Sequence, residues 1–373
     1  MELRPEHVPL AVEMVPDVWE PQTLGDLERK GQVRLGRGQV ISQVDINEFP
    51  GDYPIYSSSI HDDGLFGRYA SYMFDEELIT WSIDGGGNFF YRPKHRFSVT
   101  NVCGYMRINT TTIDYRFLAY QLQLLHEAKT YDYQMKAHPS VIRWAYTVAL
   151  PGIDEQKRIA SALSDVDALI SSLDKLIAKK RDIKQAAMQQ LLTGRRRLPG
   201  FKCTMERVRL GNIAQIVGGG TPRTGVAEYW DGEIRWCTPS DITACRGKYL
   251  AETTSNITYQ GLKSSAAQLL PPGTLLLCSR ATVGEVRIAA TEICTNQGFK
   301  SLVCGDRVNN EYLYYAIPMM KPRMVEKASG STFLELSKKD AESLELYLPP
   351  FDEQVAIASV LSDMDAEIEA LER

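Results

Sequence analysis

Arginine, lysine, asparagine, glutamine and threonine gather in polar, turn-rich stretches of both halves of this sequence. Arginine can donate two hydrogen bonds to guanine, asparagine and glutamine can pair with adenine, and threonine can contact a thymine methyl group. Lysine and arginine also fix the register of a protein on phosphates. For any single residue a place on the solvated surface is the simpler interpretation, but as a group they predict a base-reading surface. The predicted contacts are Arg92, Lys94 and Arg96 in the first half and Thr221, Arg223, Arg280, Asn296, Gln297 and Lys300 in the second.

The sequence lacks the spacings typical of catalysis, of a metal site or of a cofactor site. Leu348-Pro-Pro-Phe351 has the form of the Asp/Asn-Pro-Pro-Tyr/Phe loop of amino-methyltransferases, but Leu348 cannot accept a hydrogen from an amino group. The glycine runs 85–87 and 218–220 lack a dinucleotide fingerprint. Histidines stand only before residue 150, which excludes a histidine site shared by both halves: His7, His61, His95, His126 and His138. We therefore predict a binding protein without catalysis, cofactor or metal of its own.

One stretch of 21 residues occurs twice and organises the chain. Residues 150–170 and 348–368 are identical at 14 of 21 positions, at an offset of 198 residues. A period this long exceeds that of a solenoid repeat. It predicts two copies of a whole domain, each closed by the same helix.

Each copy has the pattern of a long helix. Pro151 and Pro349 favour extended backbone before it, and Asp154 and Asp352 are expected to cap its first turn. Apolar residues then recur at steps of three and four, which is the seam of a coiled coil, although packing of each helix on its own domain stays an alternative. The predicted seam consists of Ile159, Leu163, Val166, Ile170, Leu173 and Ile177 in the first copy and Ile357, Leu361, Met364, Ile368 and Leu371 in the second.

Length and composition describe a soluble protein of two ordinary domains. Of the 373 residues, 44% are hydrophobic and 24% are charged, and no apolar run is long enough to cross a membrane. Seven cysteines without a CxxC pair predict reduced thiols in the cytoplasm. The net charge of −5 conceals a basic middle, because residues 151–350 carry 27 basic and 21 acidic groups while residues 351–373 carry 1 and 7. Local basic patches suit phosphate binding.

The repeat divides the chain into four regions. We predict a first domain over residues 1–149, a helical region over 150–199, a second domain over 200–349 and a second helical region over 350–373. Residues 1–22 are expected to be an extended lead-in. Leu24-Gly-Asp-Leu27 recurs as Leu210-Gly-Asn-Ile213, so both are expected to open a domain of short strands and loops.

Helices are expected just before and within the repeated stretches. Asp114 is expected to cap a helix from Tyr115 to about Ala128, and a counterpart follows Asn310 as far as Ile317. The long helices are expected from Asp154 to about Leu192, ended by Gly194, and from Asp352 to Arg373.

Together, these motifs resemble the specificity subunit of a type I restriction–modification system. The resemblance rests on both repeated helices and on the stretches Met188-Gln-Gln-Leu-Leu-Thr-Gly194, Gly219-Gly-Thr-Pro222, Trp236-x-Thr-Pro-Ser-Asp241 and Asn296-Gln-Gly298. It implies an α+β fold with two target recognition domains, related by a pseudo-twofold axis and joined by long helices that pair as an antiparallel coiled coil.

The resemblance also implies a function and a set of partners. Each recognition domain would read one half of a split site in double-stranded DNA. The helices would space the two halves and dock two methyltransferase subunits, and restriction subunits would join the assembly. S-adenosylmethionine and ATP would serve the partners. Two alternatives stay open: a coiled-coil adaptor that does not bind DNA, and a stand-alone modification enzyme with fused recognition domains, which would need a methyltransferase-sized segment.

The sequence departs from the family pattern at its second helix, which stops at Arg373 without a counterpart of residues 176–197. In an antiparallel pair, Ile159, Leu163, Val166 and Ile170 would then lack their usual partner. We expect another surface to cover this stripe: a methyltransferase subunit, the N-terminal segment 1–22 or a second copy of the chain.

Overall fold

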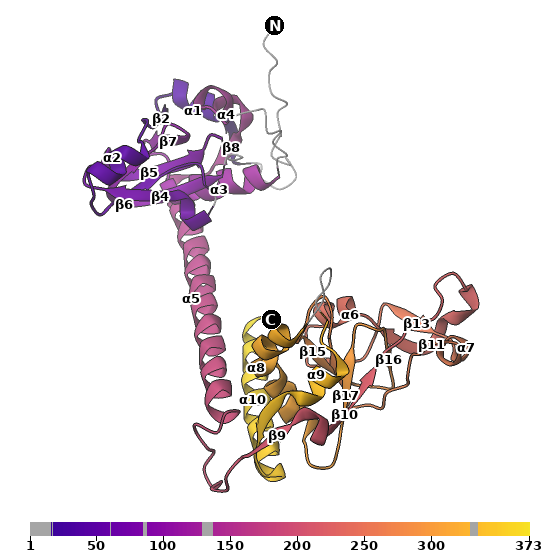
Figure 1. Ribbon diagram of the computed structural model, residues 1–373. Coiled ribbons are helices and arrows are strands. Elements are labelled where there is room, and N and C mark those ends of the chain that lie inside the picture. The colour runs from indigo at the N-terminus through magenta and orange to yellow at the C-terminus, as the bar shows by residue number, and fades with distance from the viewer. Residues whose placement is uncertain (1–15, 17, 60, 85–87, 129–136, 329–334) are drawn as a thin grey trace. The chain divides into compact units, whose positions relative to one another are not determined.

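The computed structural model describes residue 16 and residues 18–59, 61–84, 88–128, 137–328 and 335–373. The chain divides into two compact units, unit 1 from Met1 to Ser171 and unit 2 from Ser172 to Arg373 (Figure 1). The long helix α5 (Ile153–Leu191) contributes residues to both units. The greater part of the predicted lead-in, His7 and the glycine run 85–87 lie outside the described residues.

Unit 1 is built on a mixed sheet covered by a helix. In its described part, six strands pair in the order β2-β7-β5-β6-β3-β4. Helix α3 (Tyr115–Glu127) packs on β5 and β6, and its cap Asp114 accepts hydrogen bonds from the backbone amides of Arg116 and Phe117, as predicted. The strands are β2 (Val33–Arg37), β3 (Tyr53–Tyr56), β4 (Leu65–Tyr69), β5 (Phe74–Ser82), β6 (Phe89–Val99) and β7 (Cys103–Ile108), and the short helices are α1 (Leu24–Arg29), α2 (Gln43–Glu48), η2 (His61–Gly64) and α4 (Pro139–Ala145).

Unit 2 has two sheets in its described part. One follows the order β10-β17-β14-β15-β12 and the other the order β13-β11-β16. The strands are β10 (Ala214–Gly218), β11 (Trp230–Cys237), β12 (Tyr249–Leu250), β13 (Ser255–Ile257), β14 (Leu275–Leu277), β15 (Val286–Ala289), β16 (Cys294–Thr295) and β17 (Lys300–Cys304). The helices are η3 (Leu210–Asn212), η4 (Ala227–Tyr229), α6 (Pro239–Ala244), α7 (Tyr259–Lys263), α8 (Asn310–Lys327), α9 (Lys338–Ser343) and α10 (Phe351–Leu371).

The two units begin and end in the same way. In unit 1, β1 (Glu20–Thr23) pairs antiparallel with β8 (Thr147–Leu150), the strand directly before α5. In unit 2, β9 (Glu206–Arg209) pairs antiparallel with β18 (Glu345–Leu348), the strand directly before α10. The repeated Leu-Gly-x-Leu/Ile stretches follow β1 and β9, and their apolar side chains are buried. Each long helix therefore begins directly after a strand pair that joins the first and last strands of its half.

A buried glutamine fixes the first turn of each long helix. The Gln156 side-chain amide donates to the carbonyls of Thr112 (3.0 Å) and Pro151 (2.8 Å), and its oxygen accepts from the Asp114 amide at 2.9 Å. Gln354 repeats this pattern. It donates to Arg307 and Pro349 and accepts from Asn309, the cap of α8. Because every polar atom of these amides is paired, their burial carries little desolvation cost.

A tyrosine and an aspartate fasten each helix about three turns further along. The Tyr120 hydroxyl of α3 donates to Asp167, and the Tyr315 hydroxyl of α8 donates to Asp365 at 2.7 Å. Ser164 and Ser362 lie within reach of the same hydroxyls, at 3.4 and 3.3 Å. The repeated Ser-x-x-Asp pattern therefore joins α5 to α3 and α10 to α8.

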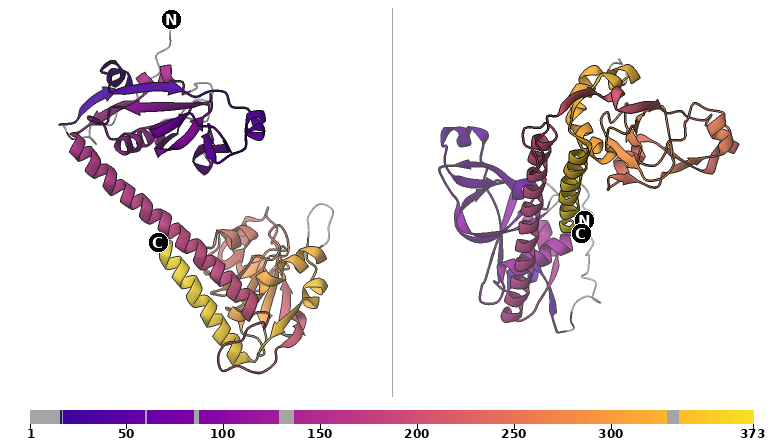
Figure 2. Two further views of the ribbon diagram at one scale, coloured as in Figure 1. Left: turned by 90° about the vertical axis from the view of Figure 1, so that its left-hand side faces the viewer. Right: turned by 90° about the horizontal axis from the view of Figure 1, so that it is seen from below.

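The C-terminal part of α5 pairs antiparallel with α10 inside unit 2 (Figure 2). Lys180 bonds Glu367 at 2.5 Å and Lys184 bonds Asp365, while beyond the end of α5 Arg197 holds the fully buried Glu353 of α10. Residue numbers rise on one helix as they fall on the other, which confirms antiparallel pairing. The apolar part of this contact belongs to one buried cluster, which includes Met188, Leu191, Leu192, Ile357, Ala358 and Leu361.

The predicted seam differs between its two copies. Ile357 and Leu361 are buried, and Met364, Ile368 and Leu371 are half-buried. In the first copy, Ile159, Leu173 and Ile177 are half-buried, whereas the side chains most exposed there are Leu163, Val166 and Ile170. The stripe expected to lack a partner is thus largely open in this chain, and its covering surface stays a prediction.

Three expectations about helix ends were wrong. Asp352 does not cap α10, because the helix begins one residue earlier and Pro350 closes the first turn with its carbonyl. Asp154 likewise lies inside the first turn of α5, where the Gly152 carbonyl accepts from Glu155 and Gln156. Helix α8 continues to Lys327 through two prolines. Burial of Met320 and Met324 on its continuing apolar face offsets the lost backbone hydrogen bonds. Gly194, at φ +72°, follows the end of α5 as predicted.

The equivalent leucines of the two copies give a matched test of the open stripe. Leu163 is 40% exposed and Leu361 is 0% exposed. We expect Leu361→Glu to lower the free energy of unfolding of unit 2 by more than about 3 kcal/mol, because it buries a charge, and Leu163→Glu to change that of unit 1 by about 0.5 kcal/mol or less. Urea denaturation of the isolated chain measures both. An equally large loss for Leu163→Glu would mean that the stripe is already covered.

Candidate nucleic-acid interface

Two loops distant in sequence meet in unit 2 around the predicted amide residues. The Gly220 amide donates to the Thr295 carbonyl at 2.9 Å, and the Thr221 hydroxyl donates to the Gln297 side-chain oxygen. A Cβ atom at position 219 would lie 2.0 Å from the Asn296 carbonyl oxygen, so only glycine allows this approach. The structure therefore places three predicted residues, Thr221, Asn296 and Gln297, at one loop junction.

A third loop joins this junction through Gly298. The Ser279 amide donates to the Gly298 carbonyl at 2.7 Å, and the Gly298 amide donates to the Asn296 side-chain oxygen at 2.8 Å. A Cβ atom at position 298 would lie 3.9 Å from the Arg280 Cβ. Arg280 follows Ser279 directly, so it stands beside the amide residues of the first two loops.

Glu335 connects two of the predicted basic residues. Its carboxylate accepts from Arg280 Nη2 at 2.6 Å and from Lys300 Nζ at 3.1 Å. These contacts hold the pKa of Glu335 below its usual value, chiefly through the Arg280 hydrogen bond. Sequence reasoning missed Glu335, because a single carboxylate 35 residues from Lys300 leaves no spacing signal.

The junction rests on the tryptophan and aspartate of the Trp-x-Thr-Pro-Ser-Asp stretch. Trp236 donates its ring N–H to the Gly220 carbonyl at 2.9 Å. Asp241 accepts backbone and side-chain hydrogen bonds from Thr238 and from Thr254. Burial alone would raise the pKa of Asp241, but these hydrogen bonds outweigh it and hold the pKa below its usual value. The stretch therefore supports the loops and presents no free carboxylate to a ligand.

Arg223 lies apart from the ion-paired residues. It is exposed, and its carbonyl accepts from the Trp230 ring N–H at 3.2 Å. The structure thus brings five of the six residues predicted in the second half together, namely Thr221, Arg280, Asn296, Gln297 and Lys300, and leaves the sixth on a neighbouring turn.

The three predicted residues of unit 1 do not share one environment. Arg92 is 5% exposed and lies over the rings of Tyr56 (3.7 Å) and Phe90 (4.8 Å). It donates to the Thr80 hydroxyl at 3.0 Å and to the Asp63 carbonyl, and burial lowers its pKa. This geometry is that of an internal cation.

Lys94 and Arg96 are exposed because β6 contains an irregularity. The pairing with β5 slips between His95 and Arg92, so one extra residue of β6 lies in the ladder and reverses which face later side chains occupy. Arg96 donates to Asp75 at 3.3 Å and lies 4.9 Å from the Tyr72 ring. An arginine held among exposed aromatic rings suits contact with a phosphate or a base.

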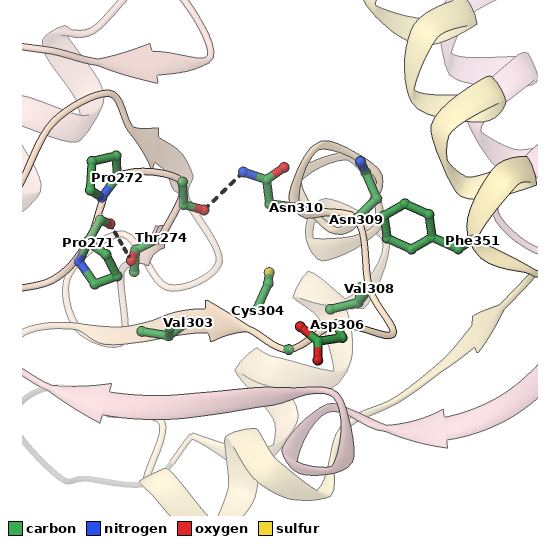
Figure 3. A pocket seen from close by; sticks show the side chains of 12 residues that line it. Pro271, Pro272, Thr274, Val303, Cys304, Asp306, Val308, Asn309, Asn310 and Phe351 are labelled. Atoms are coloured by element: carbon green, nitrogen blue, oxygen red, sulfur yellow. Dashed lines mark hydrogen bonds between the residues drawn. The ribbon is translucent and has the colours of Figure 1, made fainter.

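The principal cavity of unit 2 lies outside this junction. It has a volume of about 460 Å³ and is lined by Pro271, Cys304, Asp306, Asn310 and Phe351, among others (Figure 3). Its hydrogen bonds, from Asn310 to the Gly273 carbonyl and from Thr274 to the Pro271 carbonyl, are internal to the protein. Burial raises the pKa of the Cys304 thiol to about 12, so the thiol is protonated at neutral pH and is a poor nucleophile.

The described residues offer no obvious metal site or membrane span. Among them, no group of three histidine, cysteine, aspartate or glutamate residues is arranged to hold a metal ion. No helix of the described segments combines the length and the apolar character needed to cross a bilayer.

A family model for the type I restriction modification DNA specificity domain matches the chain twice, at residues 16–180 and 203–373. The chain belongs to this family. Both matches begin before a closing strand pair; the first ends within α5 and the second includes all of α10, so the duplicated architecture is that of type I specificity subunits.

Curated relatives carry the same description. The chain is 39% identical over 163 residues to the type I restriction enzyme MjaIX specificity subunit of Methanocaldococcus jannaschii, covering 43% of this chain and 38% of that protein. It is 28% identical over 359 residues to the putative MjaX specificity subunit of the same organism, covering 90% and 77%. The chain therefore spans well under half of the length of the first relative.

Two solved structures share the fold. The S subunit of a type I restriction–modification system from M. genitalium matches with a TM-score of 0.62 at 16% identity, covering 95% of this chain and 91% of that one. A chain from a study of complex assembly and conformational transition in a type I system matches with a TM-score of 0.56 at 20% identity, covering 96% and 93%. Both support the predicted two-domain α+β fold.

The contrast between Arg92 and Arg96 can be measured. We expect Arg92→Ala to lower the free energy of unfolding of unit 1 by about 2–3 kcal/mol, because it leaves a cavity and removes the donors to Thr80 and Asp63. Arg96→Ala, at an exposed position, is expected to change it by about 0.5 kcal/mol or less. Urea denaturation of each variant checks the difference. A stable Arg92→Ala variant with weakened DNA binding would instead place Arg92 in the interface.

Proposed function

We propose that this chain is the DNA-reading subunit of a type I restriction–modification complex, in which each unit reads one part of a bipartite site in double-stranded DNA. The observation that carries the proposal is the junction of unit 2, where Thr221, Arg280, Asn296, Gln297 and Lys300 converge from separate loops. Arginine and amide side chains on one surface are the groups that distinguish base pairs in the major groove.

Exposed basic and aromatic residues support the same role for unit 1. Lys94 and Arg96 are the proposed DNA contacts there, and Arg92 is proposed to support the sheet from within. The predicted boundaries at residues 149, 199 and 349 are kept as the proposed limits of the recognition domains and helical regions. Because the two units share strand pairs and helix anchors, we propose that they read their half-sites with the same end of the fold.

Catalysis is proposed to belong to partner subunits. The buried thiols and the fully hydrogen-bonded Asp241 suit structural roles, and the principal cavity contains no predicted DNA contact. We propose that two methyltransferase subunits dock on the long helices and that restriction subunits join them. The open stripe of α5, which includes Leu163, Val166 and Ile170, is the proposed methyltransferase contact.

Exchange of one recognition domain tests whether the two domains read separate halves of the site. We expect replacement of residues 200–349 by the same region of a related chain to change one half of the methylated sequence, because the other half is read by residues 1–149. Sequencing of methylated DNA from cells that carry the chimera with its methyltransferase measures this. A change in both halves would contradict independent reading.

Salt dependence tests DNA binding itself. In a complex with its methyltransferase subunits, we expect affinity for duplex DNA to fall roughly tenfold or more between 50 and 200 mM salt, which corresponds to at least about two phosphate contacts. The chain alone is expected to transfer no methyl group from labelled S-adenosylmethionine. Absence of salt-dependent DNA binding would favour an adaptor, and methyl transfer by the single chain would favour a modification enzyme.

A further inference from the structure

Glu335 stands between two cations whose side chains differ in exposure. The Lys300 side chain is 12% exposed, that of Glu335 is 32% exposed and that of Arg280 is 41% exposed. The cluster therefore runs from an inner lysine, through the carboxylate, to an outer arginine. A lysine side chain is rarely this buried unless it is paired, so the contact between Lys300 and Glu335 is more than a solvated surface pair. With one negative and two positive charges, the cluster keeps an excess of one positive charge.

The backbone holds Glu335 in this place. Arg280 and Glu335 form an isolated antiparallel bridge, and the Leu336 amide donates to the Ser279 carbonyl at 3.0 Å. Leu336 is fully buried in the core of unit 2. On the other side of Arg280, Ala281 has φ +58°, a conformation that side-chain-bearing residues rarely adopt. The main chain therefore fixes both partners of the ion pair before any ligand arrives.

One end of the guanidinium is held, and the Arg280 side chain as a whole is 41% exposed. Glu335 accepts from Arg280 Nη2, and within the described segments no other hydrogen bond to this guanidinium is recorded. An arginine has five N–H donors in a rigid plane. A guanine presents two acceptors that match two of these donors. Holding one nitrogen in advance leaves enough donors for such a pair and reduces the rotamer freedom lost on binding.

We propose that Glu335 is a positioning residue for base recognition: it orients Arg280 toward a guanine edge, while Lys300 offsets its negative charge. The inference rests on the proposed DNA-reading function of the junction and adds a specificity determinant to it. The carboxylate acts through Arg280 and does not itself contact DNA.

If Glu335 orients Arg280, removing its charge changes DNA sequence specificity and general DNA affinity in different ways. A carboxylate near the DNA opposes phosphate binding, whereas an oriented arginine favours one base pair over the others. Glu335→Gln keeps the shape of the side chain and removes the charge. We expect discrimination between the target duplex and a duplex altered at the base pair that Arg280 reads to fall roughly tenfold, on the scale of one base contact. Binding to unrelated duplexes is expected to stay equal or to rise, because the junction gains one net positive charge.

The experiment uses the full chain in its complex with the methyltransferase subunits. The target is first mapped from DNA methylated in cells that express the complex. Competition binding then compares this duplex, each single-base-pair variant of it and an unrelated duplex. Glu345→Gln is the matched control, because the Glu345 side chain is 32% exposed, like that of Glu335, and pairs with Arg207 at 2.5 Å on the separate β9–β18 strand pair; it is expected to bind like the parent.

A double-variant cycle decides whether Glu335 acts through Arg280. In an Arg280→Ala background, Glu335→Gln is expected to cause no further loss of discrimination. If Arg280→Ala lowers discrimination while Glu335→Gln leaves it intact, Glu335 is structural and the proposal fails, although the DNA-reading function stands. An equal loss of affinity for all duplexes in Glu335→Gln also overturns it. If Arg280→Ala changes neither affinity nor discrimination, the proposed function of the junction fails as well.

A second variant is measured if the first one does not fold. If thermal melting shows that Glu335→Gln is unfolded, Glu335→Asp is measured in its place, because it keeps the charge but shortens the side chain by one methylene. We then expect parent-like binding to the unrelated duplex and discrimination between that of the parent and that of Arg280→Ala. Discrimination equal to the parent's would reject the proposal.

Discussion

The two buried glutamine amides are the constraint on which the rest of the architecture depends. Gln156 and Gln354 each tie the first turn of a long helix to the N-cap of α3 or α8 and to the proline that precedes the turn. A buried amide that lost one of these partners would carry a desolvation penalty of about 1–3 kcal/mol. Each helix is therefore fixed in direction at its first turn, and the aspartate–tyrosine contacts hold it again about three turns further along.

The repeated stretch predicted the architecture because its signals are local. Proline, the Asp-Glu-Gln run and the spacing of three and four residues depend on neighbours along one helix, whereas the antiparallel pairing of α5 with α10 was expected from the family resemblance. The predicted seam ends at Ile177, because the next two positions of the three-and-four spacing are Lys180 and Lys184, which are not apolar. In the structure these lysines bond carboxylates of α10, and the apolar contact resumes at Met188.

The residues of the candidate interface could be predicted only in part, because residue type does not reveal which side chains a fold will bury. Glycine and tryptophan stretches indicated the junction of unit 2, and five predicted residues lie together there. Arg92 has the same chemical character as Arg96, yet an extra residue in β6 turns it inward. Glu335 could not be found from spacing, because its relation to Arg280 is created by a bridge between segments 55 residues apart.

The irregularity of β6 has a consequence for how such a domain changes its target. An extra residue accommodated within a strand shifts the side chains beyond it to the opposite face, while the hydrogen-bonded ladder on either side is preserved. A single codon gained or lost there could exchange an outward-facing set of side chains for an inward-facing one without replacing the sheet. For the DNA-reading function proposed above, the length of one strand then becomes a source of new specificities alongside the identity of its residues.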